Sequence, residues 1–149
     1  HGLPYRLPTR LEWEKAARGA DGRPFPTGHR FDPALAKLRE SRPEATQPEP
    51  VGSFPFDESP HGVRDMMGGV GDWTSTSVDG RPLPDLHAEG SPDADGRQAY
   101  NCGGHWGSTL LAHMRYPTAL RARTTGIGFR VALSLPPDHG SDLVITRIR

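Results

Sequence analysis

Two aspartates flank a glycine-rich turn in the middle of the chain. Asp65 and Asp72 stand on either side of the segment Gly68-Gly69-Val70-Gly71. Calcium takes about six to eight oxygen ligands from carboxylates, backbone carbonyls and water, and glycines leave the backbone free to turn its carbonyls inward. The spacing is therefore compatible with a calcium site. The alternative is a plain turn, because Asp is common in turns for local hydrogen-bonding reasons.

The other reactive side chains do not form a recognisable catalytic set. His105 and His113 flank Ser108, but no carboxylate that would orient a histidine base can be identified. The glycine segment lacks the lysine of a phosphate-binding loop. The single cysteine, Cys102, excludes an internal disulfide and a multi-cysteine zinc site. We therefore assign no catalytic residue from the sequence.

One helix near the start of the chain has a clear signal. Thr9 and Glu12 fit a capping box, in which each residue's side chain accepts a hydrogen bond from the other's backbone amide. Good helix formers follow, and Gly19 ends the run. We expect the three large indole rings to anchor the core, because each can bury a large area; they belong to Trp13, Trp73 and Trp106.

Short strands and loops are expected elsewhere. The predicted strands are Val51–Phe54, Gly62–Asp65, Val70–Trp73, Ala99–Trp106 and Gly128–Leu135. One helical turn is expected within Phe31–Leu38. Residues 39–50 and 78–98 are polar and rich in Pro, Gly or charge, so we expect surface loops there. Residues 141–149 alternate weakly and predict an edge strand or a disordered end.

Composition excludes several classes of protein. The chain has 149 residues with 18 Lys and Arg against 18 Asp and Glu, so its net charge is zero. A general nucleic-acid binder or a polybasic membrane-surface protein needs a positive excess. No stretch approaches the roughly 20 apolar residues of a membrane helix, and no secretory signal opens the sequence; the location is expected to be cytoplasmic or is left open. With 18 Gly and 16 Pro, we expect a loop-rich domain.

Several segments in series resemble the formylglycine-generating enzyme, or sulfatase-modifying-factor, family. Their order and approximate spacing match the family pattern. The segments are Tyr5-Arg6-Leu7-Pro8-Thr9 with the helix that follows, Pro50-Val51-Gly52-Ser53-Phe54-Pro55, Gly62 to Thr74, Gly103-Gly104-His105-Trp106 and Gly128-Phe129-Arg130-Val131-Ala132. The resemblance implies an α+β, divergent C-type-lectin-like fold. It also implies that residues 3–133 are the C-terminal half of the family domain, that residues 134–149 are a divergent tail, and that an upstream half is the natural partner.

The resemblance also bears on metals. Active family members hold copper with two cysteines, whose positions match Ser108 and His113 here, so copper and formylglycine-generating oxidase activity are not expected. A family calcium site carries over better. It implies side-chain ligands from Asp65 and Asp72 and carbonyl ligands from Gly68 and Val70. A second family calcium site is not expected, because Lys37 stands at its ligand position.

We expect a noncatalytic ligand- or protein-binding module, such as the sensor part of a bacterial serine/threonine kinase. In a lectin-like fold the ligand surface lies on the irregular segment near the C-terminus, here Trp106–Thr125. Its expected ligand-binding residues are Ser108, His113, Arg115, Tyr116, Arg121 and Arg123. Three alternatives stay open: part of an active formylglycine-generating or nonheme-iron oxidoreductase, the variable protein of a diversity-generating retroelement, or a gene remnant without selected function.

Overall fold

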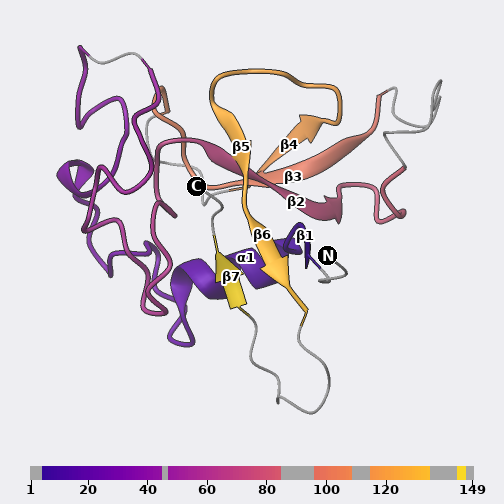
Figure 1. Ribbon diagram of the computed structural model, residues 1–149, viewed down its shortest axis with the longest axis horizontal. Helices are drawn as coiled ribbons and strands as arrows, with labels where there is room; N and C mark the ends of the chain where they lie inside the picture. Colours follow the sequence, from indigo (N-terminus) through magenta and orange to yellow (C-terminus); the bar gives the residue numbers. More distant parts are fainter. Residues whose placement is uncertain (1–4, 45–46, 85–95, 109–114, 135–143, 147–149) are drawn as a thin grey trace.

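The computed structural model describes residues 5–44, 47–84, 96–108, 115–134 and 144–146. Along the chain these form β1 (Tyr5–Arg6), α1 (Arg10–Arg18), the 3-10 helix η1 (Pro33–Leu35), β2 (Gly71–Ser77), β3 (Gln98–Cys102), β4 (Arg115–Ala119), β5 (Ile127–Phe129), β6 (Val131–Leu133) and β7 (Val144–Thr146). Figure 1 shows α1 lying beside two small sheets, with long irregular segments at the periphery. Within the described residues, no helix has the length and apolar character needed to cross a membrane.

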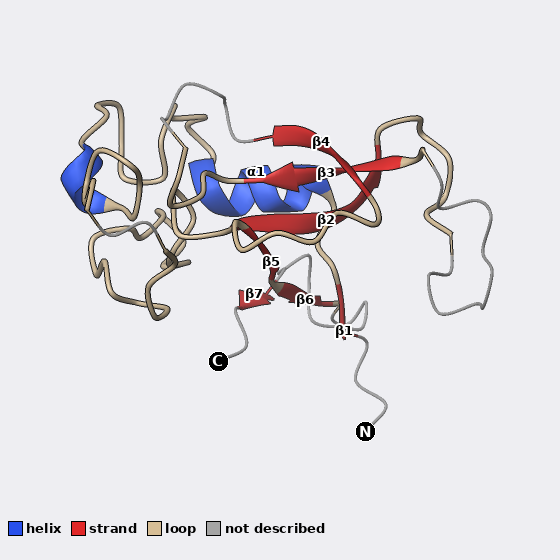
Figure 2. Ribbon diagram, turned by 90° about the horizontal axis from the view of Figure 1, so that it is seen from above, coloured by secondary structure: helices blue, strands red, loops and turns tan. Residues whose placement is uncertain are grey.

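Two sheets organise the strands. The larger sheet has the order β4-β3-β2-β5; β3 pairs antiparallel with both β2 and β4, and β5 pairs parallel with β2. The smaller sheet has the order β1-β6-β7 and is antiparallel. Helix α1 packs against β2 and β3, as Figure 2 shows from a second direction. The larger sheet therefore has one face toward α1 and one face away from it.

The predicted cap starts α1. Thr9 Oγ1 accepts a hydrogen bond from Glu12 N, and Glu12 Oε2 accepts one from Thr9 N. Arg6 adds two short contacts to the Glu12 carboxylate, at 2.6 and 2.7 Å. These contacts hold the pKa of Glu12 at about 2, with the Arg6 hydrogen bond as the main cause. They also tie β1 to the start of α1.

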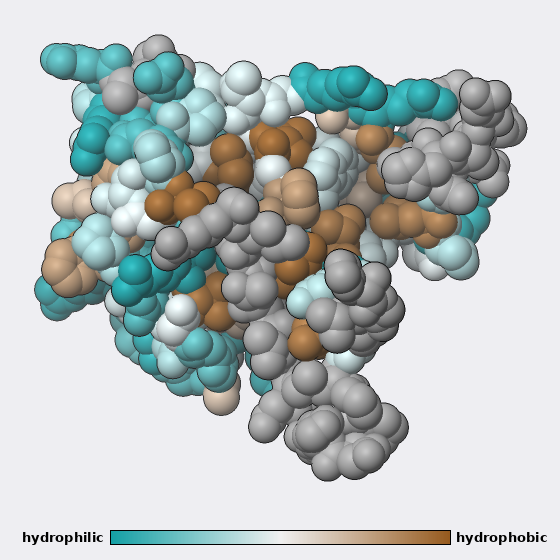
Figure 3. Space-filling model, viewed as in Figure 1, coloured by the Kyte–Doolittle hydropathy of each residue, from teal (hydrophilic) through white to brown (hydrophobic). Residues whose placement is uncertain are grey.

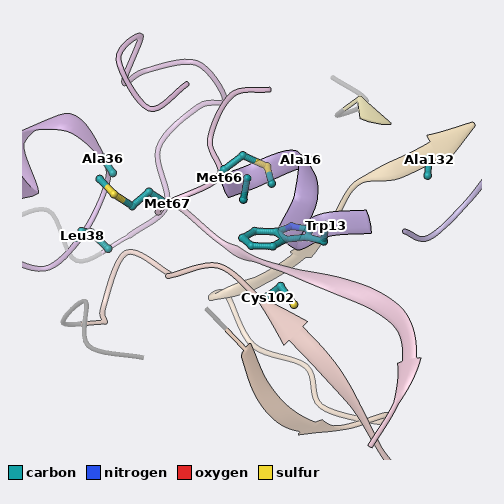
Figure 4. Packing of buried hydrophobic residues seen from close by; sticks show 9 residues of the cluster. Trp13, Ala16, Ala36, Leu38, Met66, Met67, Cys102 and Ala132 are labelled. Carbon is teal, nitrogen blue, oxygen red and sulfur yellow. The ribbon is translucent and has the colours of Figure 1, made fainter. Parts of the chain in front are cut away.

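The core is small and surrounds Trp13. Its other members share complete or nearly complete burial: Ala16, Ala17, Ala36, Leu38, Met66, Met67, Cys102 and Ala132. Figure 4 shows these side chains gathered from α1, β3, β6 and the loops between α1 and β2. Figure 3 shows apolar residues concentrated toward the middle of the visible face and hydrophilic residues at its edges.

Only one of the three tryptophans matches the expected role. Trp13 is 1% exposed, whereas Trp73 and Trp106 are both partly exposed. Trp13 projects from α1 into the core, whereas Trp73 and Trp106 do not belong to the buried cluster of the described residues. The prediction that Trp73 and Trp106 are core anchors is wrong for that reason.

Two predicted strands do not form. Residues 51–54 and 62–65 lie in turns, and only an isolated bridge joins Glu58 and Arg64 there. Buried side chains organise this region instead: Asp57 Oδ1 accepts hydrogen bonds from the backbone amides of Met66 and Met67. Side-chain to backbone bonds therefore replace the strand ladder that the apolar pattern predicted.

Other predicted strands shift their bounds. β2 runs to Ser77, β3 ends at Cys102, and the predicted 128–135 strand divides into β5 and β6 around Arg130. Gly103, with φ of 89°, turns the chain after β3. β7 confirms an edge strand within the C-terminal segment, and η1 confirms the expected helical turn. β4 was not predicted, because Trp106–Thr125 was expected to be an irregular segment; Pro117 is tolerated because β4 is an edge strand.

Candidate functional site

The face of the larger sheet that points away from α1 carries a group of polar side chains. Tyr100 packs toward α1, where the Arg10 guanidinium lies 5.7 Å from its ring centroid. Because side chains alternate along a strand, the next residue, Asn101, belongs to the opposite face. Asn101 pairs directly with Tyr116 of β4, and Ala99 pairs with Thr118. Paired residues share a face, so Asn101, Tyr116 and Thr118 lie together on the side without the helix.

A hollow of about 470 Å³ lies over this face. It is large enough for a small organic molecule, since ligand pockets typically range from about 300 to 1,000 Å³. Its described lining combines sheet residues with the turn after β3 and the approach to β5. The lining residues are Arg39, Asn101, His105, Gly107, Ser108, Tyr116, Thr118, Thr124, Gly126 and Ile127.

A tight turn fixes the rim of the hollow. Ser108 Oγ donates to the carbonyl of His105 at 2.8 Å and accepts from the amide of His105 at 3.0 Å. The amide of Gly107 donates to Nδ1 of His105 at 3.1 Å. A backbone amide can only donate, so Nδ1 is the acceptor and the neutral ring carries its proton on Nε2. Burial, followed by the nearby Arg39 charge, lowers the pKa of His105 and favours this neutral form.

Three other side chains that line the hollow can donate hydrogen bonds to a ligand: those of Asn101, Arg39 and Tyr116. Asn101 is 5% exposed, and its Nδ2 has no hydrogen-bond partner. Arg39 is exposed and makes no ion pair with any described residue. Burial raises the pKa of Tyr116, so its hydroxyl keeps the proton. The hollow therefore offers hydrogen-bond donors of both neutral and cationic kinds.

Some of the predicted ligand-binding residues line the hollow and others lie elsewhere. Ser108 and Tyr116 line the hollow. Arg115 is on β4 but belongs to the opposite face, where it lies near Trp13 and Cys102. Arg121 and Arg123 are exposed between β4 and β5, and neither lines the hollow. His113 lies outside the described residues.

Three residues of the hollow were missed as ligand-binding candidates. The sequence predicts a surface loop at Arg39 and puts both Asn101 and His105 in the strand Ala99–Trp106. The histidine has a signal in the sequence, because it directly follows the glycine pair at the end of β3. No local pattern indicates Arg39, which reaches the hollow through a turn that pairs the Arg39 amide with the Ser108 carbonyl at 3.4 Å.

Asp72 forms a buried ion pair with Arg130. Its Oδ2 accepts from Arg130 Nε at 2.6 Å and from Trp13 Nε1 at 3.0 Å. The Oδ1 atom is buried without a hydrogen-bond partner. A calcium ion at Asp72 would stand beside the Arg130 guanidinium, which already neutralises the carboxylate.

The other predicted calcium ligands gather at a different place. Asp65, Gly68 and Val70 line a cavity of about 60 Å³ that Asp72 does not reach. The same cavity is lined by the buried Lys37, whose ammonium lies 3.1 Å from Glu49 Oε1. Among the described residues, no group of three or more His, Cys, Asp or Glu side chains is placed to hold a metal. The four residues as predicted do not fit one calcium ion.

Cys102 lies in the core beneath the sheet rather than in the hollow. It is 1% exposed, and burial, with the nearby Asp72 charge, raises the pKa of its thiol to about 12. Copper binding by cysteine requires the thiolate. Cys102 is therefore a buried core residue with a protonated thiol.

Comparison with known sequences assigns this chain to a family. The model of the sulfatase-modifying factor enzyme 1-like domain matches residues 2–135. Hercynine oxygenase of Mycolicibacterium smegmatis is 40% identical over 132 residues, which cover 85% of this chain and 24% of that protein. Inactive C-alpha-formylglycine-generating enzyme 2 of Mus musculus is 38% identical over 81 residues, which cover 48% of this chain and 26% of that protein. The chain thus spans about a quarter of the length of these relatives.

Solved structures show the same fold. PvdO from Pseudomonas aeruginosa superposes with a TM-score of 0.67 at 27% identity, covering 90% of this chain and 54% of that one. Treponema denticola variable protein 1 superposes with a TM-score of 0.65 at 20% identity, covering 87% of this chain and 47% of that one. These likenesses confirm the predicted α+β, C-type-lectin-like fold. The chain belongs to the sulfatase-modifying factor enzyme 1-like family.

Proposed function

We propose that this domain binds a small polar molecule in the hollow over β3 and β4, and that its own residues do not carry out copper-dependent thiol oxidation. The observation that carries the proposal is the hollow itself: about 470 Å³ on the sheet face opposite α1, which no described helix covers. Polar side chains from the sheet, the His105 turn and Arg39 converge on its lining. Such a combination of volume and a few oriented polar groups is typical of ligand sites.

The state of Cys102 supports the noncatalytic part of the proposal. A bis-thiolate copper site needs two accessible thiolates, and soft sulfur ligands select copper(I). This chain has one cysteine, and its thiol is buried with a pKa of about 12. The family includes relatives named as inactive and relatives named as oxygenases, so membership alone does not imply catalysis.

A second candidate function follows from one comparison. Hercynine oxygenase matches over 85% of this chain, which favours a role as part of such an oxygenase. The hollow would then hold hercynine, while the reaction would depend on residues outside this chain. A link to a serine/threonine kinase and pairing with an upstream half of the domain are further proposals that rest on the resemblance to the family.

Isothermal titration of the full chain with hercynine and with N-acetylglycine tests the proposal. Thr118→Phe fills the hollow from β4, whereas Ala119→Phe places the same ring on the opposite face of the same strand. We expect the wild type and Ala119→Phe to bind equally and Thr118→Phe to bind at least about tenfold more weakly. Absence of binding for both molecules, or equal binding by Thr118→Phe, would contradict the proposed site.

The two candidate functions differ in selectivity. A part of a hercynine oxygenase should bind hercynine much more tightly than N-acetylglycine, by about 100-fold or more. A general site for small polar molecules should bind the two within about tenfold of each other.

A further inference from the structure

The geometry points to a carboxylate as the group that the hollow recognises. This inference rests on the proposed function, because it names the ligand class of the same site. Its basis is the kind of polar atom in the lining: the described side chains supply donors, and none of them is an Asp or Glu. The packing of the fold explains neither why these hydrogen-bond donors line the hollow nor why the Asn101 amide has no partner.

Arg39 provides the charge. It lines the hollow, its side chain is exposed, and it forms no ion pair with any other described residue. Arg42, close to Arg39 in the sequence, is neutralised locally because its guanidinium lies 3.0 Å from the Glu49 carboxylate. An arginine at the rim without a carboxylate partner suits a ligand that brings its own carboxylate, since guanidinium and carboxylate match in shape and charge.

Asn101 provides an unmet donor. The residue is 5% exposed, and its Nδ2 is buried without a hydrogen-bond partner. Burying an unpaired donor costs free energy, so such groups are uncommon in folded proteins. The residue lines the hollow from β3, and its neighbour Gly71 leaves room for the amide because a Cβ there would lie 2.1 Å from Asn101 Oδ1. A ligand oxygen would satisfy the amide.

His105 provides a second neutral donor. Its Nδ1 is occupied by the amide of Gly107 at 3.1 Å, which leaves Nε2–H as the free edge of the ring. Ser108 cannot take this role, because its hydroxyl already donates to and accepts from the backbone of His105. The Tyr116 hydroxyl, which keeps its proton, has no hydrogen bond to any described group and adds a further donor.

An anionic oxygen ligand fits this set better than a neutral amide or an ammonium. An ammonium would face the like charge of Arg39 and would find no carboxylate among the described lining residues. A neutral amide has one acceptor oxygen and no charge to pair with Arg39. A carboxylate accepts hydrogen bonds on both oxygens and brings the negative charge that would pair with the Arg39 guanidinium. The apolar side chain of Ile127 provides a surface for the non-polar part of a small carboxylic acid.

The test compares two probes that differ in one end group: N-acetylglycine, which carries a carboxylate at pH 7, and N-acetylglycinamide, which carries a neutral primary amide of the same shape. Binding to the ¹⁵N-labelled full chain is followed by amide chemical shifts. We expect N-acetylglycine to bind at least about tenfold more tightly than the amide. Arg39→Met and Asn101→Asp should each weaken N-acetylglycine binding by about tenfold. Arg123→Met, an exposed arginine that does not line the hollow, should leave binding unchanged.

The outcomes separate this inference from the proposed function. Equal binding of acid and amide, both abolished by Thr118→Phe, would overturn the carboxylate inference and leave the hollow as a binding site. Binding that Thr118→Phe does not affect would overturn both. Asn101→Asp conserves shape, and its dispersed amide spectrum would show that it folds. If it does not fold, the exposed Arg39→Met still decides, and undiminished acid binding by that variant would overturn the inference.

Discussion

Arg130 and Asp72 form an ion pair in which neither side chain is accessible: Nε of Arg130 lies 2.6 Å from Oδ2 of Asp72, with side-chain exposures of 0% and 1%. The same guanidinium donates from Nη2 to the carbonyl of Asp65 at 3.0 Å. Trp13 Nε1 reaches the same carboxylate oxygen from α1. One buried cluster thus joins the β5–β6 junction, β2, α1 and the loop before β2, and it supports the sheet that carries the hollow.

Removing Arg130 should be strongly destabilising. Arg130→Met leaves the Asp72 carboxylate buried without its cation, which we expect to cost about 3–5 kcal/mol of unfolding free energy. Urea unfolding of the full chain measures the loss. The matched control is Arg64→Met, because the Arg64–Glu58 pair is 56% and 40% exposed and should contribute at most about 1 kcal/mol. Similar losses of unfolding free energy in the two variants would show that the buried ion pair stabilises the fold no more than the exposed one.

Asp57 should make stability depend on pH. Burial, with a smaller effect of Asp65, raises the pKa of Asp57 to about 7, well above the usual range of an aspartate. Between about pH 4 and 7 the unfolded chain has lost this proton while the folded chain retains it, so stability should fall as pH rises, by up to about 1.4 kcal/mol per pH unit, and level off above pH 7.

Asp57→Asn isolates this effect. Urea unfolding of wild type and variant from pH 4.5 to 7.5 should show the fall in the wild type alone. Taking the difference between the two proteins removes the opposite contribution of His105, whose pKa is lowered in the fold. Parallel curves would show that Asp57 titrates normally.

Cys102 should be unreactive in the folded protein. With a thiol pKa of about 12, almost no thiolate exists at pH 8, and the side chain is buried as well. We expect Ellman's reagent to label the native chain at least about 100-fold more slowly than free cysteine, and to label one thiol promptly in guanidinium. Native labelling near the rate of free cysteine would contradict the assignment of Cys102 to the core.

Calcium should not stabilise the wild-type chain, because Asp72 is paired with Arg130 and the Lys37 ammonium lines the cavity of Asp65. We expect thermal unfolding midpoints in calcium and in chelator to agree within about 1 °C. A higher midpoint in calcium that Asp65→Asn removes would establish the calcium site predicted from the sequence.

The elements with local signals could be predicted from the sequence. The capping box of Thr9 and Glu12 sets the start of α1, and the serial motifs indicate the fold. The strands predicted at 51–54 and 62–65 are wrong because side-chain to backbone bonds from Asp57 to Met66 and Met67 hold this region in turns. β4 was not predicted because Trp106–Thr125 was expected to be an irregular ligand-binding segment.

The site was less predictable because its residues meet only in the folded chain. Tyr116 and Ser108 were expected from the Trp106–Thr125 segment. Arg39 and Asn101 come from elsewhere, and no local spacing links them. The predicted calcium ligands illustrate the converse: Asp65 and Asp72 are near in sequence, yet Arg130, from far along the chain, takes one of them.

The most direct test of the account is where a bound carboxylate lies. Intermolecular nuclear Overhauser effects from the methylene group next to the carboxylate of N-acetylglycine to the labelled full chain give that location. The account predicts contacts with the Asn101 side-chain amide and the Tyr116 ring, on the sheet face away from α1. Contacts with Tyr100 or Arg10, on the face toward α1, or no contacts at concentrations that saturate binding, would contradict it.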